Sequence, residues 1–286
     1  MKRFPKIFVS IILTILFLPI LLTFIYSIAT NWHSTVIPEG ITFKWYSELF
    51  NDKSFLDALI RTVFISSSTV LLSISVMLPT VYIIVVYFPK FERLMQSIVL
   101  LPYAIPGVIC SVGLIQIYSN PPFLLSGTIW LLMGAYFIII LPFMYQGIRN
   151  SLRNINVIEL IQAAEILGAS KTKAFIKVIV PNILSGILVS SLLSFSILFG
   201  EFVMTNFLIG GRFETVQIYL KRLMDNSGHL SSAIVISYFI FILVITTISI
   251  KISKSPKSYD KKYVYISSID KINKLKKSRI ESKEAI

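Results

Sequence analysis

Charged residues are scarce in this chain of 286 residues, making up 14% of it against 55% hydrophobic residues. Soluble domains carry about 25% charged and about 45–50% apolar residues. A chain of this length cannot bury such an apolar surplus in one aqueous core, so we expect much of it to face lipid. The mean hydropathy of +0.78 agrees with this expectation.

Cysteine and histidine are nearly absent, with one and two residues respectively. One cysteine excludes an internal disulfide, and two histidines exclude a histidine-rich metal site. His33 and His229 have no ligand-type neighbours at metal-binding spacing, and we expect both at the surface of outer loops. Cys110 falls in an apolar run, where we expect a small packed residue. The sequence therefore predicts no metal site.

A nucleotide-binding loop is missing as well. The pattern G-x-x-x-x-G-K-[ST] places lysine directly after glycine, and none of the 12 glycines is followed by lysine. No Ser-His-Asp arrangement with recognisable spacing is present either. We therefore expect a chain that is not an enzyme and that holds no cofactor of its own.

Long apolar runs are what the chain does have. A helix needs roughly 20 apolar residues to cross a bilayer core about 30 Å thick, and six stretches meet that length. The first is too long for a signal-peptide core and lacks an Ala-x-Ala cleavage site, so we expect it to be retained. The sequence predicts an all-α membrane protein with six transmembrane helices. The predicted spans are Ile7–Ala29, Val63–Phe88, Met95–Tyr118, Ile129–Ile148, Asn182–Ile209 and Ala233–Ile250.

The basic residues gather on one side of this predicted topology. Six spans place both termini on the same side, whose segments hold 21 of the 27 Lys and Arg residues, against 6 in the opposite loops. Because basic loops stay in the cytosol, we expect both termini to be cytosolic. The formal net charge of +13 then reflects topology, and we expect no nucleic-acid partner.

Proline interrupts the predicted spans at positions 19, 79, 102, 106 and 142. Each proline removes a backbone hydrogen bond and kinks its helix, which membrane helices tolerate when neighbours satisfy the freed groups. Pro102 and Pro106, followed by Gly107, make the third span the most irregular. Two interpretations stay open: ordinary helix packing, or a helix bent around a solute pathway that includes Pro102 and Tyr103.

The loop of residues 149–181 has a helical pattern of its own. Apolar and small residues recur at helical spacing from Val157 to Gly168. We expect Gly168 to end this helix and Ser170 to cap a second one beginning near Lys171. The second helix reaches Pro181, where the fifth span takes over. The prediction is therefore helix, tight turn, helix at the cytosolic face.

Small residues cluster at the predicted turn, namely Ala163, Ala164, Gly168, Ala169 and Ser170. Small side chains let a backbone approach another surface closely, so one interpretation is a corner that sits in a groove of a partner. The other is an amphipathic helix that rests on its own bundle. Periodicity alone does not separate the two.

The same segment resembles the EAA signature of ABC-importer permeases, which reads Glu-Ala-Ala, three residues, Gly, nine residues, Ile-x-Leu-Pro. Here Gln162-Ala163-Ala164 is followed after three residues by Gly168, and after nine more by Val178-x-Val180-Pro181. The spacing is kept, while Gln162 replaces Glu and two valines replace Ile and Leu. Gln162 cannot form a salt bridge with an ATPase, and Glu159 and Glu165, one turn away on either side, are candidate substitutes.

The resemblance covers roughly residues 57–250, and Phe43-Lys44-Trp45-Tyr46 is similar to an element that often precedes the second span in these permeases. It implies the MetI-like transmembrane domain of a type I ABC importer, with residues 149–181 as a coupling loop. The implied coupling residues are Glu159, Gln162, Ala163, Ala164, Glu165, Gly168, Ala169, Ser170 and Pro181.

The implied organisation has three parts: a first helix and outer loop at 1–56, the transmembrane domain at 57–250, and a basic cytosolic tail at 251–286. The implied partners are a cytosolic ATPase dimer that binds ATP and Mg, a second permease of the same or a sister chain, and an extracytoplasmic solute-binding protein. The tail either lies on anionic lipid as a weak amphipathic helix or stays solvated.

One acidic residue lies in the fifth predicted span. Glu201 follows Phe199-Gly200 in an apolar stretch, and a charge at a helix centre costs roughly 2.5–3.5 kcal/mol on insertion scales. A solute-pathway position and a structural or interfacial position both stay open. The segment resembles the subgroup that transports polyamines, ferric iron, thiamine or aminoethylphosphonate, and the spermidine/putrescine type is favoured. The candidate pathway residues are Glu201, Thr205, Asn206, Pro102 and Tyr103.

We therefore predict the permease subunit of an ATP-driven, binding-protein-dependent importer of a small polar solute, in the inner membrane of a bacterial cell. The main alternative is a secondary transporter driven by an ion gradient. The first three spans do not obviously match the last three, which speaks against an inverted-repeat carrier. A membrane scaffold or sensor without transport activity is the second alternative.

Overall fold

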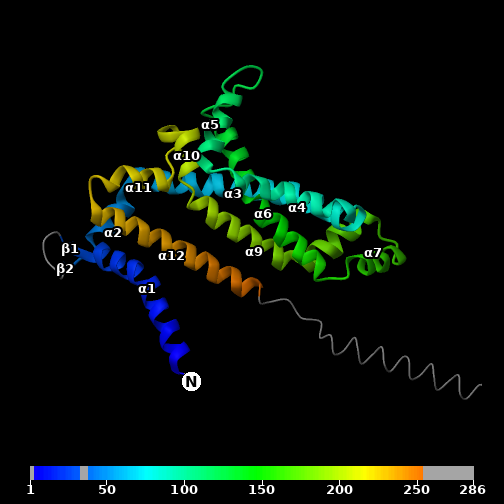
Figure 1. The fold of residues 1–286 in the computed structure, drawn as a ribbon, viewed down its shortest axis with the longest axis horizontal. Coiled ribbons are helices and arrows are strands. Elements are labelled where there is room, and N and C mark those ends of the chain that lie inside the picture. Colours follow the sequence, from blue (N-terminus) through cyan, green and yellow to red (C-terminus); the bar gives the residue numbers. More distant parts are fainter. Residues whose placement is uncertain (1–2, 33–37, 254–286) are drawn as a thin grey trace, which may run out of the picture.

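The computed structural model describes residues 3–32 and 38–253, which form an elongated, mostly helical bundle (Figure 1). Its five longest helices are α1 (Arg3–Ile28), α3 (Lys53–Tyr87), α6 (Ile129–Arg153), α9 (Val180–Phe199) and α12 (Gly228–Ser253). The shorter helices are α2 (Lys44–Asn51), α4 (Glu92–Leu100), α5 (Gly107–Tyr118), α7 (Val157–Ile166), α8 (Lys171–Ala174), α10 (Val203–Leu208) and α11 (Val216–Met224). Strands β1 (Ala29–Asn31) and β2 (Glu39–Ile41) pair antiparallel, with Ala29 opposite Ile41.

The apolar helices confirm the predicted multi-pass membrane fold. Among the residues that the structure describes, five helices are long and apolar enough to cross a membrane, and a sixth crossing is present if one bent pair counts as a single span. The first, fourth and sixth predicted spans coincide with α1, α6 and α12 apart from a few residues at their ends, while α3, which contains the second span, begins at Lys53 and not at the predicted Val63. The third and fifth predicted spans differ.

The third predicted span is two helices that meet at an angle of 97°. A single 3₁₀ turn, Leu101–Ala104, ends α4, and the extended Ile105 precedes Pro106 at the start of α5. Pro102 and Pro106 supply no backbone N–H, so a continuous helix cannot form across them. As a result α5 leaves the bundle and projects to one side together with the loop of residues 119–128 (Figure 1).

The fifth predicted span, Asn182–Ile209, is wrong at both ends. The helical segment begins at Lys171 and stops at Phe199. It stops there because Gly200 caps its end, while the Glu201 carboxylate accepts backbone N–H bonds from the next short helix, α10. The predicted single helix of Asn182–Ile209 is therefore a shorter α9 followed by the separate α10.

The core of the bundle lies where α3, α6 and α9 pack against one another. The side chains of α6 dominate this core, and the fully buried ones are Leu132, Tyr136, Ile140, Met144, Tyr145 and Ile148. In contrast, α1 packs along α12 and leaves the apolar candidate span Phe8–Ile28 unburied except at Ser27, near its end. Helix α1 is therefore an outlying helix, as its all-round apolar surface suits.

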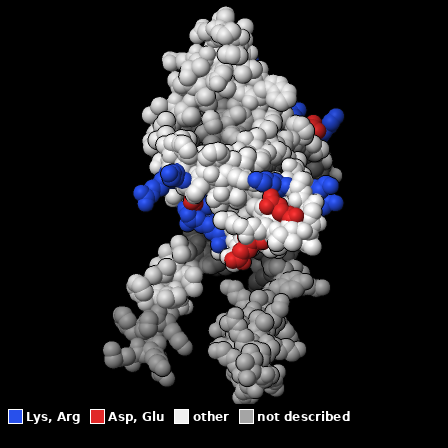
Figure 2. Space-filling model, turned by 90° about the vertical axis from the view of Figure 1, so that its right-hand side faces the viewer, with Lys and Arg blue, Asp and Glu red and all other residues white. Residues whose placement is uncertain are grey.

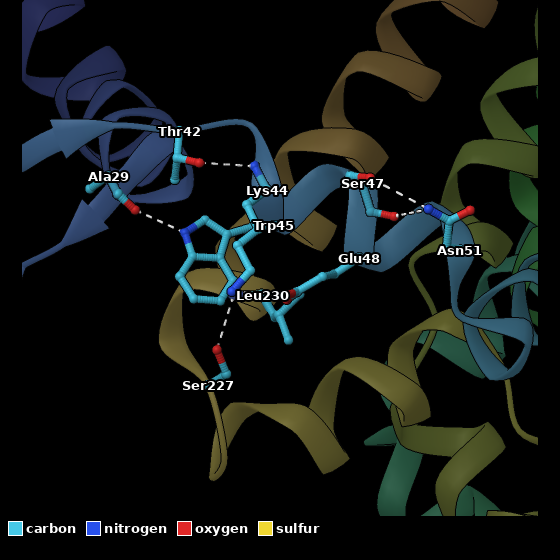
Figure 3. Close-up of polar contacts among 9 residues, drawn as sticks. All are labelled: Ala29, Thr42, Lys44, Trp45, Ser47, Glu48, Asn51, Ser227 and Leu230. Atoms are coloured by element: carbon cyan, nitrogen blue, oxygen red, sulfur yellow. Dashed lines mark hydrogen bonds and ion pairs between the residues drawn. The ribbon is translucent and has the colours of Figure 1, made fainter.

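Aromatic residues close the end of the bundle that carries the β1–β2 hairpin, and Figure 3 shows one of them, Trp45, with its bond to Ala29. The Trp45 indole N–H of α2 donates to the Ala29 carbonyl oxygen at 2.8 Å, and the Tyr46 hydroxyl bonds the Ser27 hydroxyl at 2.7 Å. The ring of Trp45 also stacks on His229. The Trp-Tyr element noted in the sequence thus ties α2 to the ends of α1 and α12.

The expectation that His229 lies at the surface is wrong. His229 is 4% exposed, because it lies in the first turn of α12, where its ring stacks between Tyr26 and Trp45. Its Nδ1 atom is 2.9 Å from the Tyr26 carbonyl oxygen. The other histidine, His33, and the basic tail beyond residue 253 lie outside the described residues, so the predictions made for them stay predictions.

Candidate coupling corner and polar cleft

The helix–turn–helix predicted in the loop 149–181 is present at the end of the bundle opposite the hairpin (Figure 1). We call residues 157–174 the corner. Helix α7 ends at Ile166, and Gly168 has φ +81°, a left-handed conformation that glycine adopts without strain. The Ser170 hydroxyl accepts a bond from the Lys173 N–H at 3.4 Å and caps α8. Both predicted roles are confirmed.

The two faces of α7 differ in burial. Val157, Ile161 and Ala164 are buried against the bundle, so the helix does rest on its own protein. The opposite side is bare, and at its tip Ile166 is 86% and Leu167 88% exposed. Each of the two open interpretations therefore describes one face, and the exposed apolar tip has no cover within the described chain.

The predicted coupling residues divide between these faces. Ala164 is buried, Ala169 is half-buried, and Pro181 is exposed in the first turn of α9. The other predicted coupling residues are all exposed, namely Glu159, Gln162, Ala163, Glu165, Gly168 and Ser170. Gln162, Ala163 and both flanking carboxylates therefore lie on the open side, where a partner has access to them.

The corner is joined to α9 without a break. Residues Lys171–Phe199 form one continuous helical segment, in which Phe175–Ile179 make a π-helical turn. Pro181 follows that turn directly, and its missing N–H and bulky ring oppose regular α-helical bonding to the preceding turn. The predicted second helix therefore does not end at Pro181, but changes its winding there and continues as α9.

A cleft of about 630 Å³ lies beside the corner, between α6 and α9; most of its lining is apolar, and we call it the polar cleft for the several polar side chains that it also contains. Its polar lining includes Gln146 and Asn154 of α6, Asn182 and Ser185 of α9, and Tyr103 of the bend between α4 and α5. Gln146 and Asn182 are exposed. Polar side chains facing hydrocarbon are costly in a membrane helix, so this face is suited to water or to another protein.

Small residues let α6 and α9 approach closely at the floor of the cleft. Gly147 and Ser151 of α6 meet Gly186 and Ser190 of α9, and each pair is four residues apart on one helix face. A methyl group placed on Gly186 would overlap the Ser151 hydroxyl, and one placed on Gly147 would lie 2.7 Å from the Ser190 hydroxyl oxygen. The helix crossing is of the small-residue type found in membranes.

The predicted pathway residues are not brought together. Tyr103 lines the cleft, and its hydroxyl donates to the Ile139 carbonyl oxygen at 3.2 Å, while Pro102 lies in the same bend. The Glu201 carboxylate is instead occupied at the start of α10, where it accepts the N–H groups of Met204 and Thr205 at 2.8 and 3.1 Å. Thr205 is buried against Tyr136, and Asn206 is exposed beside it.

The sequence analysis missed the amides of the cleft. Gln146, Asn154 and Asn182 are polar residues in or beside apolar spans, and that pattern was a signal for a non-lipid face. Their meeting depends on how α6 and α9 cross, which no sequence spacing specifies. It also missed Glu92, whose carboxylate forms ion pairs with Arg149 and Arg153 and so fastens α4 to α6 near the corner.

These features define a multi-pass helical membrane protein with a contact surface at one end and a polar face along its bundle. Residues 45–254 match the family described as binding-protein-dependent transport system inner membrane component. The chain belongs to this family, whose members are ABC transporter permeases rather than catalytic subunits.

Two curated relatives illustrate the family. The 2-aminoethylphosphonate transport system permease protein PhnV of Salmonella typhimurium is 23% identical over 212 residues, which cover 74% of this chain and 79% of the relative. The spermidine/putrescine transport system permease protein PotC of Escherichia coli is 22% identical over 226 residues, covering 76% and 81%.

Two solved structures share the fold. One is a bacterial ABC transporter involved in the import of the acidic polysaccharide alginate, with a TM-score of 0.67 and 18% identity over 87% of this chain and 95% of the other. The other is the MetNI methionine ABC transporter in inward-facing conformations, with a TM-score of 0.55 and 18% identity over 71% and 98%. The MetI-like permease fold expected from the sequence is confirmed.

Proposed function

We propose that the chain translocates a small polar solute across the bacterial cell membrane, driven by a separate cytosolic ATPase that docks on the corner. The observation that carries this proposal is the apolar tip of Ile166 and Leu167, which is fully open beside Gln162 and Glu165. Exposed apolar side chains rimmed by polar ones mark protein contact sites. The ATPase supplies the phosphate-binding loop that this sequence lacks.

The orientation follows from charge. The corner end carries Arg153, Lys171, Lys173 and Lys177, and Figure 2 shows basic and acidic side chains gathered around it. By the positive-inside rule, we propose that the corner and both termini lie in the cytosol. The hairpin end faces outward, where we propose that a solute-binding protein delivers the solute.

A second permease, either another copy or a sister chain, is proposed to cover the cleft. The projecting α5 and the loop after it carry no charged residue and appear as a white prominence in Figure 2. Their exposed apolar side chains include Ile109, Ile117 and Phe123, and they adjoin the polar cleft through Tyr103. Lipid can solvate the apolar prominence but not the polar side chains of the cleft, whereas a second permease could contact both surfaces.

For the solute, we propose an uncharged or zwitterionic polar molecule in preference to a polycation. The polyamine expectation drew on Glu201, whose carboxylate is engaged at α10. The described lining of the cleft offers amides and hydroxyls but no carboxylate to balance a polycation. The relative PhnV, named for 2-aminoethylphosphonate, fits this chemistry better than PotC. Uptake of labelled 2-aminoethylphosphonate and putrescine, measured side by side, tests the choice.

The corner is tested by Gly168→Trp. A methyl group at Gly168 meets nothing within 4 Å, so tryptophan adds bulk toward a docked partner without a clash inside the bundle, although the left-handed backbone at φ +81° also strains the turn. We expect the variant to insert in the membrane, lose ATPase co-purification and lose uptake. Gly168→Asn is the matched control, because asparagine tolerates left-handed backbone. Full ATPase binding and uptake by Gly168→Trp would refute the docking role.

An ion-gradient-driven transporter makes the opposite prediction. Uptake would then survive deletion of the ATPase and collapse when the membrane gradient is dissipated. We expect uptake to stop when the ATPase is deleted.

A further inference from the structure

The inference concerns how a movement of the corner reaches the membrane helices, and it rests on the proposed function. We infer that Phe175 and Tyr82 are the contact through which the corner moves α3 together with α9. Phe175 opens the π-helical turn between α8 and α9, and Tyr82 lies five residues before the end of α3.

The π-helical turn is a local departure from regular winding in an otherwise continuous helix. It lies between Ala174 and Val180, and Ala174 and Ile179 are both fully buried. A π-turn widens the backbone by one residue and is a weak point at which helices bend. A displacement of α8 therefore reaches α9 through the π-turn, which bends easily. The displacement is passed on fully only if a lateral contact with a neighbouring helix prevents this bending.

Tyr82 provides that lateral contact. Its ring lies 4.3 Å from the Phe175 ring, centroid to centroid, at 36°, and Tyr82 is buried within the α3–α6–α9 core. A second contact runs parallel to it, because the Lys171 ammonium of α8 lies 5.7 Å from the centre of the Tyr87 ring, also on α3. Both contacts lie on the α8 side of the π-turn, so this side of the turn is fastened to the last turns of α3.

The packing around this contact favours transmission from the corner. Helix α7 packs on the same π-turn, so the corner, the turn and the end of α3 form one contiguous block. Since α9 lines the cleft and α3 packs on both α6 and α9, a displacement of that block changes the width of the cleft. A packing role alone would affect stability but not the response of the cleft to ATP.

The test measures the opening of the cleft directly and requires no knowledge of the solute. Cys110 is replaced by serine, and Ser185, which lines the cleft, by cysteine. The complex with the cognate ATPase is then labelled with a water-soluble maleimide, with and without ATP and vanadate. We call the Cys110→Ser, Ser185→Cys protein bound to its ATPase the parent complex. In this complex we expect ATP to change the rate at which the cysteine at position 185 is labelled.

Phe175→Leu in this background removes the ring contact and keeps an apolar side chain. We expect ATPase co-purification to persist while the ATP-dependent change in labelling falls about two- to tenfold, the range that an aromatic pair represents. Ile176→Leu is the matched control, because Ile176 is the next residue and is 57% exposed; it should keep the full response. Tyr82→Leu should reduce the ATP-dependent change in labelling as much as Phe175→Leu does. The double variant should reduce it no further than either single variant, because both remove the same contact.

The outcomes separate the two proposals. If the parent complex binds no ATPase or shows no ATP-dependent labelling, the proposed function fails and the inference fails with it. If the parent responds and Phe175→Leu responds as fully as Ile176→Leu, only the transmission role is refuted. The transmission role is also refuted if Phe175→Leu, Tyr82→Leu and Ile176→Leu all reduce the ATP-dependent labelling change equally, because that result would show a general loss of packing.

Discussion

The crossing of α6 over α9 gives the most quantitative prediction, because a single glycine sets how closely the helices approach. A methyl group at Gly186 would overlap the Ser151 hydroxyl and lie 2.8 Å from Ser151 Cβ. The Ser151 hydroxyl itself donates to the Gly147 carbonyl oxygen at 2.8 Å. Gly186→Ala therefore either breaks the hydrogen bond of Ser151 to the Gly147 carbonyl oxygen or increases the distance between α6 and α9.

The expected cost follows from overpacking. Inserting a methyl group into a packed interface costs about 1–3 kcal/mol, which corresponds to about 2–12 °C in melting temperature for a domain of this size class. Alanine also favours helix over glycine by up to about 1 kcal/mol, which reduces the net effect. The gain in helix propensity has to be measured separately.

Gly134→Ala is the matched control for that gain. Gly134 lies on α6, and a methyl group there meets nothing within 4 Å. We expect Gly134→Ala to leave the melting temperature unchanged or raised, and Gly186→Ala to lower it by several degrees, in purified protein heated before gel filtration. The double variant Ser151→Gly with Gly186→Ala moves the methyl group across the interface and should recover most of the loss.

Two outcomes would contradict this account. If Gly186→Ala and Gly134→Ala have the same melting temperature, the helices do not meet at Gly186. If Gly186→Ala is destabilised and Ser151→Gly fails to rescue it, the cost arises from another neighbour.

Two further predictions concern carboxylates. The Glu201 carboxylate accepts N–H bonds from Met204 and Thr205, and a glutamine side chain offers fewer acceptors. Glu201→Gln should therefore lower the free energy of unfolding by about 0.5–2 kcal/mol and leave the uptake per folded transporter unchanged. If the variant loses uptake at unchanged stability, Glu201 belongs to the solute pathway. The Tyr219 hydroxyl donates to Asp52 and holds the pKa of Asp52 below its ordinary 3.8. Because this pKa is lower in the folded state, the stabilisation is present at neutral pH and is lost as the pH falls below about 4. Tyr219→Phe should therefore lower the melting temperature more at pH 7 than at pH 3, and equal losses at both would contradict the bond.

The corner could be predicted in detail because its determinants are local. Gly168 and Ser170 end one helix and begin the next through backbone conformation and a hydroxyl cap, and both act within a few residues. Long apolar helices were equally predictable, since their length is set by the bilayer. The exposed tip of Ile166 and Leu167 was not foreseen, because burial depends on what the rest of the chain covers.

Most errors arose where structure depends on contacts distant in sequence. The end of α9 is the exception, because the Glu201 carboxylate that caps the following helix acts only three and four residues further along, while the apolar stretch itself runs on to Ile209. His229 was assigned to the surface because it falls in a predicted outer loop, yet its stacking partners Tyr26 and Trp45 lie far away in the sequence and meet it only in the fold. Prolines marked the bend of the third span, but neither its angle nor its projection from the bundle follows from their positions.

The corner and the cleft are connected by the same helix, and this connection limits how either can move. Helix α9 begins at the π-turn beside the corner and holds Asn182, Gly186 and Ser190 in the wall of the cleft. At Gly186 and Ser190 it is in tight contact with α6, so it cannot slide inward there without a steric overlap. Under the proposed function, we expect the cleft to open and close by tilting of α9 about this contact, with Gly147 and Gly186 at the pivot. In this view, Gly147 and Gly186 let α9 tilt against α6, and Tyr82 and Phe175 pass the displacement of the corner to α3 and α9.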